Sequence, residues 1–66
     1  MTLEEQFNEQ ADMLEQAMKE KRPYCTIYKM FEVFEDLYEE IKMPSCQQQD
    51  KFIKMYFKYV GYTDRN

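Results

Sequence analysis

The sequence predicts a small all-α protein, an antiparallel three-helix bundle with helices at approximately 2–20, 24–42 and 45–60. Two observations predict this fold. In each range the apolar residues recur every three or four positions, which places them on one face of a helix. Pro23 and Pro44 separate the ranges, because proline removes a backbone donor from a continuing helix. Connections this short make successive helices antiparallel neighbours.

The chain of 66 residues is close to the lower limit for a core that folds without help. It contains one Gly and two Pro, so a flexible chain of several parts is not expected. We predict a single helical domain over 1–61, followed by a tail at 62–66. The alternative is a helical hairpin that dimerises into a four-helix bundle, with the third segment swapped between copies.

The first helix begins with a capping box. Thr2 is followed three residues later by Glu5, so the Thr oxygen can accept from the backbone of Glu5 while the Glu side chain reaches back. The residues expected in the core are Leu3, Phe7, Ala11, Leu14 and Met18. Pro23 marks the boundary after this helix.

The second helix has the most clearly divided faces. Its predicted core residues are Ile27, Met30, Phe31, Phe34, Leu37, Tyr38 and Ile41, which occupy about a third of the helix circumference. The opposite side is acidic and consists of Glu32, Glu35, Asp36, Glu39 and Glu40. The helix begins at Pro23 or is capped by Thr26, and the sequence leaves both starts open.

The third helix also begins with a capping box, formed by Ser45 and Gln48. Gly61 is placed to end it in the left-handed conformation. Its polar side is one stripe of Lys51, Lys54 and Lys58. The remaining residues between 52 and 60 are apolar and sweep roughly 200° of the circumference, about twice what a surface helix needs.

This surplus of apolar side chains predicts a binding surface. If Phe52, Tyr56 and Val60 point into the bundle, then either the pair Met55 and Tyr59 or the pair Ile53 and Phe57 is left on a flank. A contiguous exposed apolar patch usually marks an interface with a partner or a second copy. The alternative is ordinary exposure of apolar groups on a small protein. We favour the interface, and a homodimer is one form of it.

The acidic face of the second helix is the other candidate surface. Its central residues are Glu32, Glu35, Asp36 and Glu39, spaced so that like charges are neighbours. A solvated face that keeps the protein in solution is the simpler interpretation. The more specific hypothesis is recognition of a basic surface, including imitation of nucleic-acid phosphates to block a DNA- or RNA-binding protein.

Direct binding of nucleic acid is not expected. The net charge is −4, whereas nucleic-acid binders usually carry a basic footprint. Lys51, Lys54 and Lys58 are too few to neutralise several phosphates. Residues 1–22, 23–43 and 44–66 carry net charges of −3, −3 and +2, so the lysines are expected to pair with acidic helices of the same or a second molecule.

The sequence does not predict an enzyme, a cofactor or a metal site. It has no His, and Cys25 and Cys46 have neither a His partner nor the spacing of a zinc or redox motif. Because each cysteine starts a different helix, the bundle places them at opposite ends, too far apart for a disulfide. The chain shows no signal peptide and no membrane-spanning run, so we expect a cytoplasmic protein.

These features together predict a non-catalytic protein-binding module, a small inhibitor or adaptor that docks on a larger protein. The residues proposed for binding are Ile53, Phe57, Met55, Tyr59, Glu32, Glu35, Asp36 and Glu39. In general style, as a compact, acidic and aromatic-rich chain without catalytic groups, the protein resembles the accessory proteins with which bacteriophages inhibit host factors. The alternative function is an acidic nucleic-acid mimic.

Overall fold

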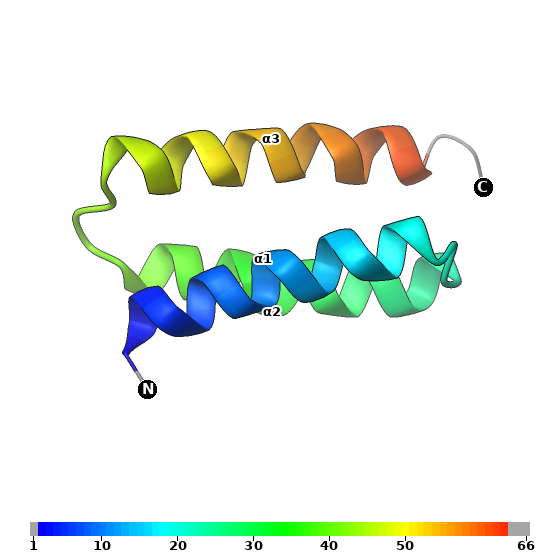
Figure 1. Cartoon of the computed structure of the whole chain (residues 1–66), viewed down its shortest axis with the longest axis horizontal. Helices are drawn as coiled ribbons and strands as arrows, with labels where there is room; N and C mark the ends of the chain where they lie inside the picture. Colours follow the sequence, from blue (N-terminus) through cyan, green and yellow to red (C-terminus); the bar gives the residue numbers. More distant parts are fainter. Residues whose placement is uncertain (1, 64–66) are drawn as a thin grey trace.

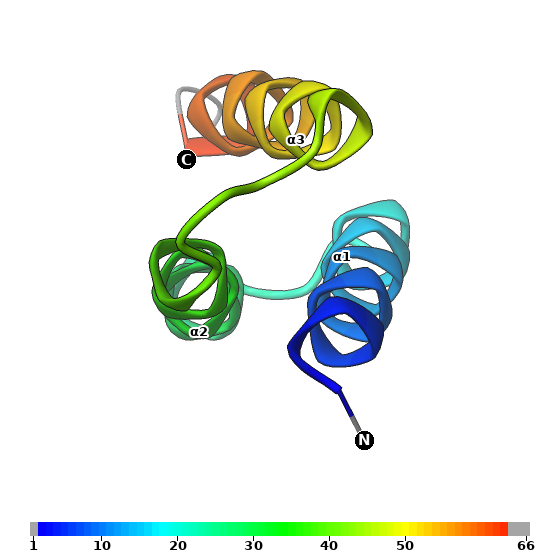
Figure 2. The same cartoon turned by 90° about the vertical axis from the view of Figure 1, so that its left-hand side faces the viewer.

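A computed structural model of the chain describes residues 2–63 and confirms the all-α three-helix bundle (Figure 1). The helices are α1 (Leu3–Lys19), α2 (Tyr24–Glu40) and α3 (Cys46–Thr63). Seen end-on, they lie at the corners of a triangle, and each runs antiparallel to the helix before it (Figure 2). No helix in the described part of the chain is both long enough and apolar enough to cross a membrane.

Both predicted N-terminal caps are present, and the reciprocal capping box is complete at Ser45. The Thr2 hydroxyl accepts from the Glu5 N–H at 3.1 Å and donates to the Glu5 carboxylate at 3.2 Å. At the start of α3, the Ser45 N–H donates to Gln48 Oε1 at 2.8 Å, and the Gln48 N–H donates to Ser45 Oγ at 3.2 Å. These bonds satisfy backbone groups that a helix end otherwise leaves unpaired.

The connection between α1 and α2 is a Schellman turn that the sequence did not reveal. The Arg22 N–H donates to the Ala17 carbonyl and the Lys21 N–H to the Met18 carbonyl, each at 3.1 Å. Lys21 has a φ of 58°, the left-handed conformation that glycine usually adopts at this position. Pro23 then serves as the N-cap of α2, and the helix begins at Tyr24, the start of the predicted range 24–42. Pro23 is therefore not its first residue, and Thr26 does not cap it.

The predicted end of α3 at Gly61 is wrong. The helix continues to Thr63, and Gly61 does not have a positive φ. The extra turn is held in place by Tyr62, which packs against the core and donates a hydrogen bond from its hydroxyl to the Arg22 carbonyl. Tyr62 and Thr63 are therefore helical rather than part of a tail, and the rest of the predicted tail, 64–66, lies outside the described residues.

The core consists mainly of residues from α1 and α2. Its buried members are Phe7, Ala11, Leu14, Ala17, Ile27, Phe31, Phe34 and Met55. One predicted core residue is misplaced, because Leu3 is exposed in the first turn of α1, at the end of the bundle. Ala17, which was not predicted, is buried instead. Met18 and the outer apolar residues of α2 are only half-buried.

Aromatic rings attach α3 to the other two helices. The Tyr38 and Phe52 rings stack with centroids 4.2 Å apart, and the Phe31 and Tyr59 rings stack at 4.3 Å. The α1 and α2 backbones approach one another more closely than either approaches α3. This spacing reflects side-chain size, since α1 contributes two alanines to the core whereas α3 contributes Met and large rings.

Candidate protein-binding surface

The inward face of α3 is not the one that the sequence predicted. Met55 is 4% exposed and belongs to the core, while Tyr59 is half-buried against Phe31. Tyr56 and Val60, which were expected to point inward, are exposed. Of the four apolar residues proposed for binding, Ile53 and Phe57 are therefore exposed on the surface. Met55 is buried and Tyr59 is half-buried, so they are less accessible to a partner.

Four exposed side chains form a continuous stripe along the outside of α3. Ile53 is 51% exposed, Tyr56 46%, Phe57 68% and Val60 37%. Their spacing of three, one and three residues places them on one helix face. We call this set the apolar stripe. Sequence reasoning identified Ile53 and Phe57 but missed Tyr56 and Val60, because it assumed that those two were buried.

The apolar stripe has different neighbours on its two sides. On one side lies α2, because the Tyr56 and Phe31 ring centroids are 6.2 Å apart and the Tyr24 and Tyr59 hydroxyls are 3.3 Å apart. On the other side lies α1, which contacts the lysines of α3. Lys51 Nζ donates to Asn8 Oδ1 at 3.2 Å, and Lys58 Nζ lies 3.5 Å from the Glu15 carboxylate.

The acidic residues of α2 border the stripe on the α2 side. We call Glu32, Glu35, Asp36 and Glu39 the acidic stripe, and all four are exposed. A hydrogen bond to Glu32, together with its charge, raises the pKa of the Tyr28 phenol, which places Glu32 on the tyrosine side of α2. None of the four belongs to a salt bridge within residues 2–63.

A pair of tyrosines connects the acidic stripe with α3. The Tyr24 and Tyr59 rings are stacked 6.3 Å apart, and their hydroxyls share a hydrogen bond. Burial is the main cause that raises the pKa of Tyr59, followed by the bond to Tyr24. The α2 and α3 surfaces form one face, with apolar groups along α3 and carboxylates along α2.

Within 2–63, no group of three or more His, Cys, Asp or Glu residues is arranged to hold a metal ion. Cys25 and Cys46 are free and exposed, in agreement with the prediction that the bundle keeps them apart. Grooves beside α1 are lined by side chains of both charges, including Glu15 and Lys58, and are open to solvent. The exposed apolar and acidic stripes remain the most distinctive surface.

Comparison with known proteins adds no relative to this description. No family model, no curated protein and no solved structure matches the chain. Function is therefore inferred from the surface formed by the apolar stripe and the acidic stripe.

Proposed function

We propose that this protein is a non-catalytic binding module, a small inhibitor or adaptor that docks on a larger protein through the face formed by the apolar stripe and the acidic stripe. The observation that supports this proposal is the continuous exposure of Ile53, Tyr56, Phe57 and Val60 along one helix face. Contiguous exposed apolar patches often mark interaction sites.

The apolar stripe would provide most of the binding free energy. Complete burial of a large apolar side chain contributes about 1.5–3 kcal/mol relative to full exposure, and these four are about half exposed. The stripe therefore offers roughly 3–6 kcal/mol before the costs of association are subtracted. Phe57 and Tyr56 supply aromatic groups of the kind found at the centres of interfaces.

The acidic stripe would determine which partner binds. Exposed carboxylates add little affinity individually, but they steer association and reject acidic surfaces. The partner expected from this charge is a protein with a basic border around an apolar site. We place this activity in the cytoplasm, where the exposed thiols of Cys25 and Cys46 stay reduced.

Matched serine variants test the proposal. Ile53→Ser and Phe57→Ser remove exposed groups of the stripe, while Val33→Ser and Met43→Ser remove exposed groups outside it. After a captured protein has been identified and purified from the native host, its affinity for each variant is measured by calorimetry. We expect the stripe variants to bind at least about tenfold more weakly and the controls to bind normally. Equal binding by all four would refute the docking surface.

A nucleic-acid mimic is the second candidate function. Four neighbouring carboxylates that are exposed and make no salt bridge within 2–63 favour it. It predicts binding to a DNA- or RNA-binding protein that weakens steeply with salt and is competed by the nucleic acid. Charge reversal of the whole acidic stripe should then abolish binding, while Glu4→Lys with Glu9→Lys, on the exposed side of α1, should not.

A further inference from the structure

The apolar stripe has the spacing of a coiled-coil seam. Ile53 and Val60 are seven residues apart, and Tyr56 lies between them at the position that completes an a/d pattern. Cys46 lies seven residues before Ile53 and is exposed, so the same line extends to the first residue of α3. The α3 helix therefore carries two seams, one against its own bundle and one open to solvent.

The two edges of the open seam carry opposite charge. Glu32 and Glu35 of α2 are exposed along one edge. Lys54 lies along the other, because it shares its helix side with Lys51 and Lys58, which contact α1. Lys54 is 73% exposed, and among residues 2–63 its salt bridge is with Asp50 of its own helix, at 3.0 Å. Figure 2 shows the three helices end-on, with α2 and α1 below opposite edges of α3.

We propose that a second copy of this chain occupies the apolar stripe, so that two α3 helices pack in parallel around a two-fold axis. The inference rests on the proposed function in that the stripe is a protein-binding surface, and it identifies the first protein bound there. The second copy and the larger partner would then compete for the apolar stripe, so docking of the larger partner requires the dimer to dissociate.

Charge decides the orientation of the two copies. A two-fold axis parallel to the helices brings the acidic edge of each copy opposite the lysine edge of the other. An axis perpendicular to the helices makes them antiparallel and brings acidic edge against acidic edge. Only the parallel pair is electrostatically complementary. The β-branched side chains of Ile53 and Val60, seven residues apart, also suit a parallel two-stranded seam.

The heights along the bundle agree with this orientation. The Phe31 ring lies 6.2 Å from Tyr56, and the Phe34 ring lies 5.6 Å from Phe52. The Phe31 ring also stacks on Tyr59 at 4.3 Å, so Glu32 and Glu35, the next residues on α2, lie level with the segment of α3 between Phe52 and Tyr59, which contains Lys54. A two-fold axis along the helices preserves these levels, so Lys54 of one copy faces Glu32 and Glu35 of the other.

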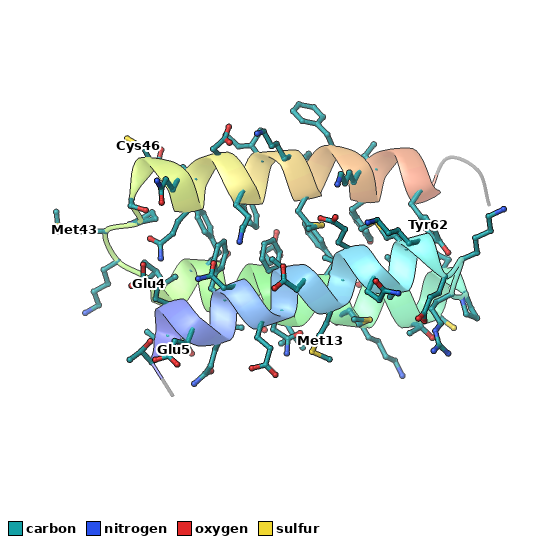
Figure 3. The ribbon with its side chains drawn as sticks, in the orientation of Figure 1. Glu4, Glu5, Met13, Met43, Cys46 and Tyr62 are labelled. Atoms are coloured by element: carbon teal, nitrogen blue, oxygen red, sulfur yellow. The ribbon has the colours of Figure 1, made fainter. Side chains whose placement is uncertain are left out.

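Cys46 reports the orientation directly. In the parallel dimer, the two Cys46 thiols meet across the axis at the start of α3, where Figure 3 shows this residue. In an antiparallel pair they are about 30 Å apart, because each lies about ten residues before the centre of the stripe. A diazenedicarboxamide oxidant joins neighbouring thiols: two thiols lose two protons and two electrons, a sulfur–sulfur bond forms, and the reagent becomes a hydrazine.

The first experiment measures assembly and crosslinking of the full chain. Sedimentation equilibrium should show a monomer–dimer equilibrium with a dissociation constant of about 100 µM, as expected for a small interface. Ile53→Ser should raise this constant at least about tenfold, whereas Val33→Ser, an equally exposed control, should not. The Cys25→Ser variant should form a covalent dimer on oxidation and the Cys46→Ser variant should not. If sedimentation still shows a dimer but neither cysteine variant forms a covalent dimer on oxidation, the parallel arrangement is refuted.

A charge exchange provides the second test. Lys54→Glu should weaken dimerisation about fivefold, because it creates two repulsive contacts per dimer. Combining it with Glu32→Lys and Glu35→Lys should restore the original dissociation constant. Failure of this rescue would overturn the orientation. A protein that stays monomeric at about 1 mM but still needs Ile53 to bind a larger partner would overturn the second copy and leave the proposed function intact. A monomer that binds no partner would overturn both.

Discussion

The α1–α2 hairpin and α3 are built in different ways, although the three helices have similar lengths. Seven of the eight buried core residues belong to α1 and α2, and only Met55 belongs to α3. Ala11 and Ala17 allow α1 and α2 to approach closely. The α3 helix instead contacts them through the half-buried rings of Phe52 and Tyr59 and through polar groups such as Lys58.

This difference explains why the exposed apolar side chains that could bind a partner lie on α3. A helix that buries a single side chain completely retains apolar groups that a better-packed helix would have used for its own core. In α3 these groups are Ile53, Tyr56, Phe57 and Val60. Such an element also opens at a lower free energy than the hairpin, because local stability follows the amount of buried apolar contact. The element that contributes least to the core is therefore the one most available to a partner.

The largest effect is expected at Phe34, which joins the two regions. It is fully buried, and its ring stacks on Phe7 of α1 at 4.7 Å and on Phe52 of α3 at 5.6 Å. Phe34→Ala should cost about 3–5 kcal/mol and leave a domain of this size largely unfolded. Urea titration followed by circular dichroism measures the change. Phe57→Ala, at an exposed ring, should cost less than about 0.5 kcal/mol, and equal losses for the two variants would contradict the core described above.

A smaller effect is expected at Met55, the single fully packed residue of α3 among those described. Met55→Ala should cost about 2–3 kcal/mol, since it leaves a cavity between α3 and the hairpin. Hydrogen exchange distinguishes the two regions. In the wild type the α3 amides should exchange faster than those of α1 and α2, and the substitution should widen this difference. Uniform exchange across the three helices would show that hairpin and α3 form one cooperative unit.

A modest effect is expected at Tyr62, which anchors the last turn of α3 to the hairpin. Its hydroxyl donates to the Arg22 carbonyl, and Figure 3 shows the side chain between the end of α3 and the end of α1. Tyr62→Phe keeps the ring and removes the donor, so it should cost about 0.5–1.5 kcal/mol. The loss should appear as faster exchange of amides near Gly61 while those of α1 keep their protection. No change at the end of α3 would mean that ring packing alone holds it.

The sequence predicted most of the buried residues of the hairpin but not the buried face of α3, for a physical reason. Phe7, Leu14, Ile27 and Phe34 could be predicted to be buried because each apolar arc is narrow and has a charged face opposite it. On α3 the apolar arc is wide, so several rotations about the helix axis bury a similar area. Ring stacking between Phe31 and Tyr59 selects one of them, and a contact between residues so far apart in the chain leaves no periodic signal.

The ends of the helices show the same limit. Capping boxes are local, so Thr2 and Ser45 could be recognised in the sequence. The end of α3 depends on the distant bond from Tyr62 to Arg22, which no local pattern reveals. The turn after α1 depends on a residue type that is unusual for its conformation. Glycine was expected to mark such a position, and the chain uses Lys21 instead.

Substitution of Lys21 is expected to change the free energy of unfolding least. It is also the one change expected to stabilise the protein. A residue with a Cβ in the left-handed conformation is strained by about 1–2 kcal/mol, and its φ of 58° is in that region. Lys21→Gly removes this strain but adds about 0.5–1 kcal/mol of backbone entropy to the unfolded state. We expect a net stabilisation of about 0.5–1 kcal/mol, seen as a higher urea midpoint with an unchanged slope. Lys21→Ala removes the charge and keeps the strain, so it should leave the midpoint close to wild type. If alanine stabilises as much as glycine, the gain comes from the lost lysine charge beside Arg22, and the turn is not a source of strain.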